Sequence, residues 1–274
     1  MEHFNPTGKV VTSMKRTSAQ LKQSARMALN GKYGTPMAGF LLLAVIAVSL
    51  YMLSTALFGG YSISTMVMEQ IFTIVISLIL SVFSAGFFKL HLNLCRNQPF
   101  RAGDIAYAFS HHPDRIIISA FLQSIPGFIV QVPLYAALMT YYQHPERMTN
   151  LSLNLIMLGT TLAGSLVNLF VKLLFFLSIP MLLDNPELGA LDSLRESFRL
   201  LKGHRGRLLY IELSFLGMLV LSVFSCYIGL LWVVPYMTAT QVFFYLDVTG
   251  ELDEPVQETH AEYQTPYGNY NDIG

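Results

Sequence analysis

Charged residues are scarce in this sequence of 274 residues: they make up 12% of it, against roughly 25% in an ordinary soluble domain. The apolar stretches contain the fewest, and the 22 residues from Met37 to Phe58 include no Asp, Glu, Lys or Arg. A helix of about 20 such residues, rising ~1.5 Å per residue, crosses a ~30 Å hydrocarbon core. Comparable runs begin near Ile71, Ile116, Leu151 and Leu208. The scarcity of charge therefore argues against a soluble protein and predicts a polytopic membrane protein.

The chain also has few of the residues that build reactive sites. Its two cysteines, Cys95 and Cys226, are too few for a disulfide framework, and we expect two free thiols. The adjacent His111 and His112 have no cluster of Cys or carboxylate residues beside them, as a metal site would need. The sequence has no nucleotide-binding loop and no paired carboxylates or Ser-His set that would face one side of a membrane. We therefore expect no metal, no cofactor and no enzymatic activity.

Lysine and arginine are absent beyond Arg207, whereas residues 247–274 contain seven acidic residues. Segments 1–36, 89–115 and 184–207 hold fifteen of the seventeen Lys and Arg residues. Positive residues accumulate in short cytoplasmic loops, so this distribution predicts a cytoplasmic N-terminus. We divide the chain into a basic cytoplasmic segment (1–36), a transmembrane helical domain (37–248) and an acidic, disordered tail (249–274).

The apolar runs predict an all-α transmembrane bundle of six spans, with five as the alternative. The first four spans are expected at about 37–58, 69–90, 116–139 and within 151–183. In the second span, Ser77, Ser81 and Ala85 have the small-xxx-small spacing that lets helices approach closely. The third contains Pro126 and Pro133, which predict kinks.

The last apolar region, from Leu208 to Val248, is too long for one span. Gly229 lies near its middle and Pro235 follows, so a tight turn between spans at about 208–227 and 230–247 is favoured. The competing interpretation is a single long kinked helix, which would give five spans in total. Six spans place the tail in the cytoplasm beside the basic N-terminal segment, whereas five place it outside.

Each basic segment contains a stretch with helical apolar spacing. Such helices lie in the headgroup region with their apolar stripe in the acyl boundary, or they pack on the underside of the membrane domain. The stripes are Met14, Leu21, Ala25, Ala28 and Leu29; Phe100, Ile105 and Phe109; and Leu191, Leu194, Phe198 and Leu201.

A few polar residues interrupt the predicted spans. Lys172 either contacts an anion or substrate inside the bundle or snorkels to the nearby cytoplasmic face. Glu212, at the cytoplasmic start of the fifth span, is a candidate partner for it. The amides are expected to hydrogen-bond between helices, as structural contacts, and they are Asn154, Asn168, Gln123, Gln131 and Gln241. A polar path through the bundle would have to use Lys172, Asn168, Glu212 and Gln131.

Several short motifs resemble one family of bacterial integral membrane proteins. Ser24 to Tyr33 and Leu191 to Gly203 are similar to its "AR-x-x-L-x-G" opening. Leu213 to Gly217 matches its leucine-serine-phenylalanine span, and Leu231 to Tyr236 matches its Leu-Trp-x-x-Pro-Tyr motif, before the pair Phe244-Tyr245. Over residues 20–247 the chain resembles the DUF975 family. The resemblance implies a bacterial plasma-membrane protein and no particular activity.

Three classes of function stay open at this point. The favoured class is a non-catalytic protein with an organising, assembly or regulatory role in the bacterial envelope. The alternative is a small-molecule transporter or permeation protein, and a membrane enzyme acting on lipid is the weakest class. The expected partners are the lipid bilayer and an unidentified protein that docks on the cytoplasmic tail, and no nucleic acid is expected.

Overall fold

The computed structural model describes residues 16–59, 62–144 and 151–253, and the regular structure in these ranges is entirely helical. Met14 and most of the acidic tail, which entered the predictions above, lie outside the described residues. In chain order the elements are α1 (Ser18–Leu29), α2 (Gly34–Phe58), α3 (Ile63–Cys95), η1 (Ala102–Ala106), α4 (Tyr107–Ser110), α5 (Pro113–Gln143), α6 (Leu151–Phe175), α7 (Ser178–Asp184), α8 (Ala190–Leu200), α9 (Arg205–Phe224), α10 (Leu230–Val248) and η3 (Glu251–Asp253).

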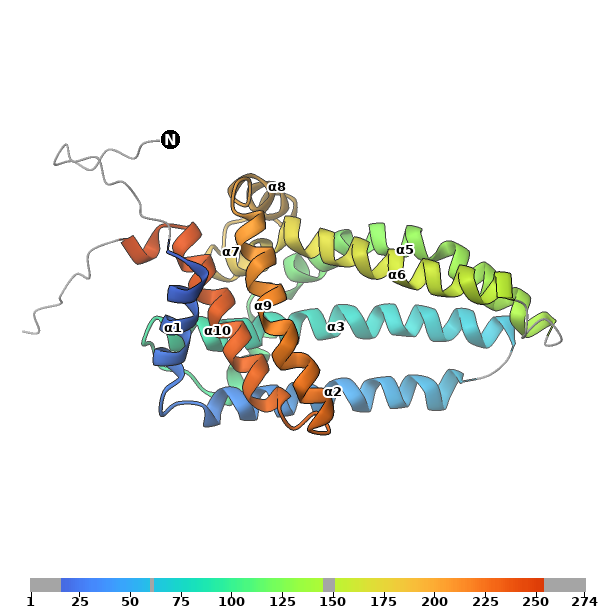
Figure 1. Ribbon diagram of the computed structural model, residues 1–274, viewed down its shortest axis with the longest axis horizontal. Coiled ribbons are helices and arrows are strands. Elements are labelled where there is room, and N and C mark those ends of the chain that lie inside the picture. The colour runs from blue at the N-terminus through green and yellow to red at the C-terminus, as the bar shows by residue number, and fades with distance from the viewer. Residues whose placement is uncertain (1–15, 60–61, 145–150, 254–274) are drawn as a thin grey trace, which may run out of the picture.

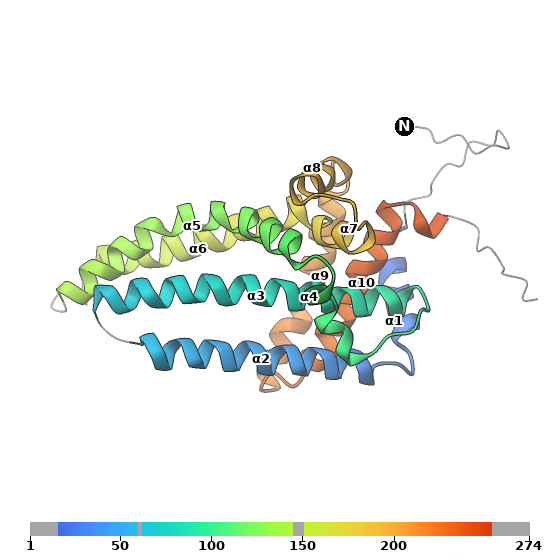
Figure 2. The same ribbon diagram turned by 180° about the vertical axis from the view of Figure 1, so that it is seen from behind.

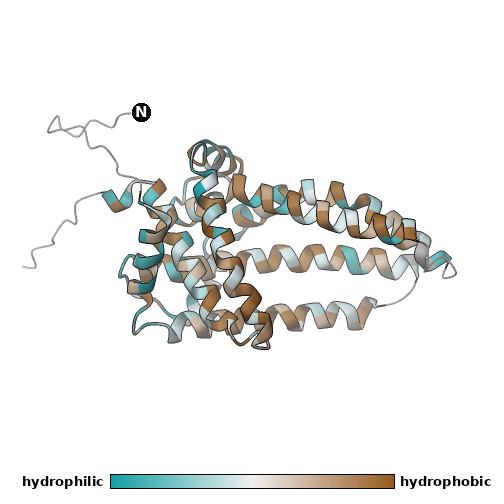
Figure 3. Cartoon of the chain, in the orientation of Figure 1, coloured by the Kyte–Doolittle hydropathy of each residue, from teal (hydrophilic) through white to brown (hydrophobic). Residues whose placement is uncertain are grey.

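Four long helices, α2, α3, α5 and α6, run along the long axis of the molecule (Figure 1). In the part of the chain that the structure describes, five segments are long and apolar enough to cross a membrane: Gly34–Phe58, Ser64–Cys95, Pro113–Thr140, Leu151–Asp184 and Arg205–Phe224. Hydrophobic residues recur along these helices (Figure 3), and many large ones are exposed, among them Met52, Ile129 and Leu166, as a lipid environment requires. The prediction of an all-α, multi-pass membrane bundle is confirmed.

The final apolar region forms a helical hairpin. Helix α9 ends at Phe224 and α10 begins at Leu230, so the interpretation as one long kinked helix is wrong. Cys226 and Tyr227 in the turn have positive φ angles of 52° and 65°, which reverse the chain within a few residues. Figures 1 and 2 show both helices running across the direction of the long helices, with their turn only partway along the bundle.

Helix α10 is the most enclosed element of the described chain, with thirteen of its nineteen residues buried. It is not among the five candidate spans, because Pro235, Gln241 and Asp247 reduce its apolar character. Helix α1 packs against it and buries Leu21 and Leu29 completely. The predicted apolar stripe of the first basic segment therefore faces protein.

The apolar stripes predicted in the second and third basic segments are only partly buried in protein. In the middle segment Ile105 is buried beside α3, while Phe109 is exposed. In α8 the buried face contains Ser193 and Ser197, whereas Leu191 and Phe198 are 63% and 46% exposed. The outward-facing apolar residues of α8 are those expected of a helix in contact with lipid.

Candidate functional site

A cavity of about 560 Å³ lies between α3, α5, α6, α7 and α10. One part of its wall is apolar and aromatic. It comprises Phe87 and Phe88 from α3, Phe175 at the end of α6, and Phe176, which follows α6. The polar part comprises Ser77, Ser81, Ser84, Gln123, Ser124, Asn168, Lys172, Thr238 and Gln241. The volume is within the range of about 300–1,000 Å³ that is typical of small-molecule sites.

Lys172 joins this cavity to a carboxylate on the neighbouring helix. Its Nζ donates to Oε2 of Glu212 at 3.2 Å, and Nε2 of Gln241 donates to Oε1 of the same carboxylate at 2.6 Å. The pairing of Lys172 with Glu212 that the sequence suggested is present. Three helices, α6, α9 and α10, thus share one hydrogen-bonded unit beside the cavity.

Asn168 and Gln131 pack against glycines of the facing helix. A Cβ on Gly127 would lie 2.5 Å from Oδ1 of Asn168, and one on Gly164 would lie 3.3 Å from the side chain of Gln131. In the α5–α6 pair, each helix therefore has a glycine against which an amide side chain of the other helix packs. Asn168 also lines the cavity, whereas Gln131 is not among the residues that line it.

One face of α3 is polar between residues 70 and 84. Gln70, Thr73, Ser77, Ser81 and Ser84 follow one another at spacings of three or four residues, which places them in one row on a helix. Gln70 and Thr73 line a second cavity of about 380 Å³, which also contains Glu69 and Tyr135. The other three residues line the larger cavity. Ser77, Ser81 and Ala85, which have the small-xxx-small spacing, all line the larger cavity. Ala85 is also buried in the contact with α4 and α5, and the close helix approach at the two serines stays a prediction.

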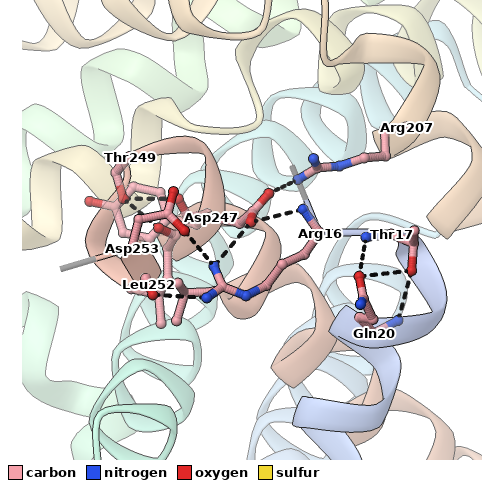
Figure 4. Close-up of polar contacts among 10 residues, drawn as sticks. Arg16, Thr17, Gln20, Arg207, Asp247, Thr249, Leu252 and Asp253 are labelled. Carbon is pink, nitrogen blue, oxygen red and sulfur yellow. Dashed lines mark hydrogen bonds and ion pairs between the residues drawn. The ribbon is translucent and has the colours of Figure 1, made fainter. Parts of the chain in front are cut away.

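A charged cluster joins the two ends of the described chain. Figure 4 shows Arg16, just before α1, directed at Asp247 near the end of α10. Its guanidinium lies 3.5 Å from Oδ1 of Asp247 and 3.1 Å from Oδ1 of Asp253, and it donates to the carbonyl of Leu252 at 2.9 Å. Arg207 at the start of α9 pairs with the other oxygen of Asp247. The beginnings of α1 and α9 are thereby fixed to the end of α10.

A second cluster centres on Arg96, the residue that follows α3. Its guanidinium binds both oxygens of Asp184 at 2.8 and 2.7 Å and Oε2 of Glu251 at 2.6 Å. The hydroxyl of Tyr245 donates to the same Asp184 at 2.8 Å. Burial acts to lower the pKa of Arg96, but the hydrogen bonds to the two carboxylates outweigh it and raise the pKa above its ordinary value.

The structure brings together three of the four predicted polar residues. Asn168 and Lys172 line the cavity and Glu212 binds Lys172, whereas Gln131 lies outside the lining. Sequence reasoning missed the row on α3, although its spacing of three and four residues was visible. His111 and His112 are exposed, and no group of three or more potential metal ligands occurs in the part of the chain that the structure describes.

The comparisons with known proteins give a family. A family model described as "Protein of unknown function (DUF975)" matches residues 14–251. Neither a curated protein nor a solved structure matches the chain.

Proposed function

Because the chain belongs to the DUF975 family, whose description gives no activity, we propose from the cavity that it is a small-molecule transport or permeation protein without catalytic activity. The observation that supports this proposal is the polar row on α3, which borders both cavities. A polar solute crossing the bilayer needs hydrogen-bonding partners along its route, because each unsatisfied polar group in hydrocarbon costs several kcal/mol. The row supplies an amide and four hydroxyl groups in succession.

The proposal places the protein in a bacterial plasma membrane with a cytoplasmic N-terminus. The distribution of Lys and Arg among the loops supports this orientation. In this orientation the larger cavity, near the charged clusters, is closer to the cytoplasm, and the smaller one is closer to the outside.

Accessibility to water tests the route directly. Single cysteines are introduced at Ser77 and at Ser81 in a variant that lacks Cys95 and Cys226. Intact cells are then treated with a small, charged thiol reagent that does not cross membranes. A route predicts labelling at Ser77 and Ser81. A cysteine at Val75, which is exposed on another face of α3, is the control and should stay unlabelled in lipid.

Two outcomes would contradict a route along α3. The first is the absence of labelling at both serine positions in permeabilised as well as intact cells. The second is equal labelling at Val75, which would mean that the reagent reaches the whole helix and not one row.

An organising role in the envelope is the second candidate. It is supported by the charged clusters, in which Arg16, Arg96 and Arg207 fix the chain where the acidic tail begins. A protein partner would then bind the cytoplasmic tail. Complementation of a deletion strain separates the two candidates, with sensitivity to toxic compounds and the envelope stress response as readouts. Filling the cavity with Ser81→Trp should abolish a transport function, whereas truncation after Asp253 should abolish an organising function.

A further inference from the structure

The larger cavity contains a single fixed cation. Lys172 is the only Lys or Arg among the described residues that line it. The side chain of Lys172 is 46% exposed, whereas that of its partner Glu212 is 13% exposed. An ammonium group has three donors, and the described contacts use one of them, to Glu212. Lys172 therefore retains the capacity to bind an additional acceptor from the cavity.

Glu212, the partner of Lys172, accepts a second hydrogen bond from another residue. Gln241 donates to Oε1 of Glu212 at 2.6 Å, which is shorter than the contact from Lys172 at 3.2 Å. Glu212 does not line the cavity. If Lys172 turned towards a ligand, Glu212 would keep its hydrogen bond from Gln241. The movement of Lys172 would therefore not leave this carboxylate without a hydrogen-bond partner.

The remaining wall favours an apolar body on the same ligand. Four phenylalanines, Phe87, Phe88, Phe175 and Phe176, line the cavity together with Lys172. Burial of apolar surface against them contributes roughly 25 cal/mol per Å². A small hydrophilic ion would leave this surface unused, whereas an amphipathic molecule would use both parts of the wall.

We propose that the cavity binds an amphipathic anion, with its carboxylate or phosphate group on Lys172 and its apolar part against the phenylalanines. This inference rests on the proposed function and names its class of ligand. A free fatty acid and an anionic lipid present the same chemistry to the site, and the experiment below distinguishes these sources.

The test uses the full chain in nanodiscs of phosphatidylcholine and follows thermal unfolding. The probes are decanoate, decyltrimethylammonium and decanol, which share an alkyl chain and differ in charge. Decanoate at a concentration of about 100 times its Kd should raise the unfolding midpoint of the wild type by about 5–10 °C. The other two probes should have little effect.

The variants assign the effect to Lys172. Lys172→Met should lose the response to decanoate, and Lys172→Arg, which keeps the charge, should retain it. Lys202→Met removes an exposed lysine outside the cavity and should respond as the wild type does. The proposal is overturned if Lys172→Met responds fully to decanoate, or if the decyl cation stabilises the wild type as strongly as the anion.

Nanodiscs of equal parts phosphatidylcholine and phosphatidylglycerol identify the source of the anion. If lipid occupies the site, these discs should stabilise the wild type relative to Lys172→Met, and added decanoate should give no further shift. If the natural ligand is a free anion, phosphatidylglycerol should have no effect and decanoate should act as before. Either result supports an amphipathic anion at Lys172.

A cavity-filling variant separates this inference from the proposed function. If decanol or the decyl cation stabilises the wild type and Ser81→Trp abolishes that effect, the cavity binds ligands and only the choice of an anion fails. If Ser81→Trp changes no response to any probe, the cavity is not the binding site, and the proposed function fails with the inference.

Discussion

At the scale of single residues, the contact between Lys172 and Glu212 combines a charge inside the bundle with a partner that neutralises it. A lysine at the centre of a membrane helix costs about 2.5–3.5 kcal/mol on insertion scales, and the cost is smaller for Lys172, which lies in the last turn of α6. Pairing offsets part of this cost, but removal of one member leaves the other charge in a low-dielectric environment.

Lys172→Met should therefore destabilise the protein by about 1–3 kcal/mol, because the partly buried Glu212 keeps its hydrogen bond from Gln241 but loses the charge that neutralises it. The double variant Lys172→Met, Glu212→Gln should recover most of this loss, because no unpaired charge remains. Thermal unfolding in detergent measures both. Equal unfolding midpoints for the single and double variants would argue against an energetically significant pair.

A second residue-scale constraint is the approach of η1 to α3. A Cβ on Gly86 would lie 2.0 Å from the carbonyl oxygen of Ile105, so the backbone would have to shift. Gly86→Ala should destabilise the protein by about 1–3 kcal/mol, as overpacking does. Gly159→Ala on α6 has open space around it and should be neutral or stabilising by up to about 1 kcal/mol. Unfolding midpoints compare the two, and a stable Gly86→Ala protein would contradict the close approach.

At the scale of elements, α8 has two faces of unusual composition. Ser197 accepts a hydrogen bond from the backbone N–H of Leu177 at 3.1 Å, so a polar face is buried against the bundle. Leu191 and Phe198 face outward beside Arg195 and Arg199, which are strongly exposed. This arrangement suits a helix whose apolar residues enter the acyl boundary while its arginines meet headgroups.

Fluorescence quenching by brominated lipids tests this placement of α8. Tryptophan is introduced at Phe198, or at Arg195 as a control, in a variant with Trp232→Phe. The tryptophan at position 198 should be quenched strongly, because it reaches the acyl chains, and the one at position 195 should be quenched less. Quenching that is equal and weak at both positions would place α8 in water.

The sequence predicted the positions of the helices better than it predicted which face of each helix is buried. Apolar run length located the five candidate spans, and Gly229 located the break between α9 and α10. Periodicity could not decide which side of α8 is buried, because the buried serines satisfy their hydroxyl groups: Ser193 donates to Ala190 in its own helix, and Ser197 accepts from Leu177. The spacing of the serines on α3 was visible in the sequence, but the cavity that they border is created only by the tertiary arrangement.

At the scale of the whole molecule, the charges that are separated in the sequence meet in space. The basic residues Arg16 and Arg96 bind the acidic Asp253 and Glu251, so both ends of the described chain lie at the same end of the bundle. The basic residues therefore have a structural role in addition to their predicted effect on orientation. These contacts could not be predicted from the sequence, because each depends on the hairpin of α9 and α10 returning the chain.

This hairpin decides on which side of the membrane the tail emerges. Helix α10 runs back along α9 and ends beside Arg207, at the start of α9. The tail should therefore leave on the side where α9 begins, whether the hairpin crosses the bilayer completely or enters it only partway. Together with the predicted cytoplasmic placement of the basic loops, this gives the prediction of a cytoplasmic tail.

Fusions to alkaline phosphatase, which is active only outside the cytoplasm, measure the location of the tail. A fusion after Gly274 should be inactive. A fusion after Gly60, in the predicted outside loop, is the matched control and should be active. High activity after Gly274, at equal expression, would mean that the segment from Leu230 to Val248 does not return to the side of α9 where Arg207 lies. The contacts of Asp247 with Arg16 and Arg207 could not form in such a protein, because a membrane would separate them.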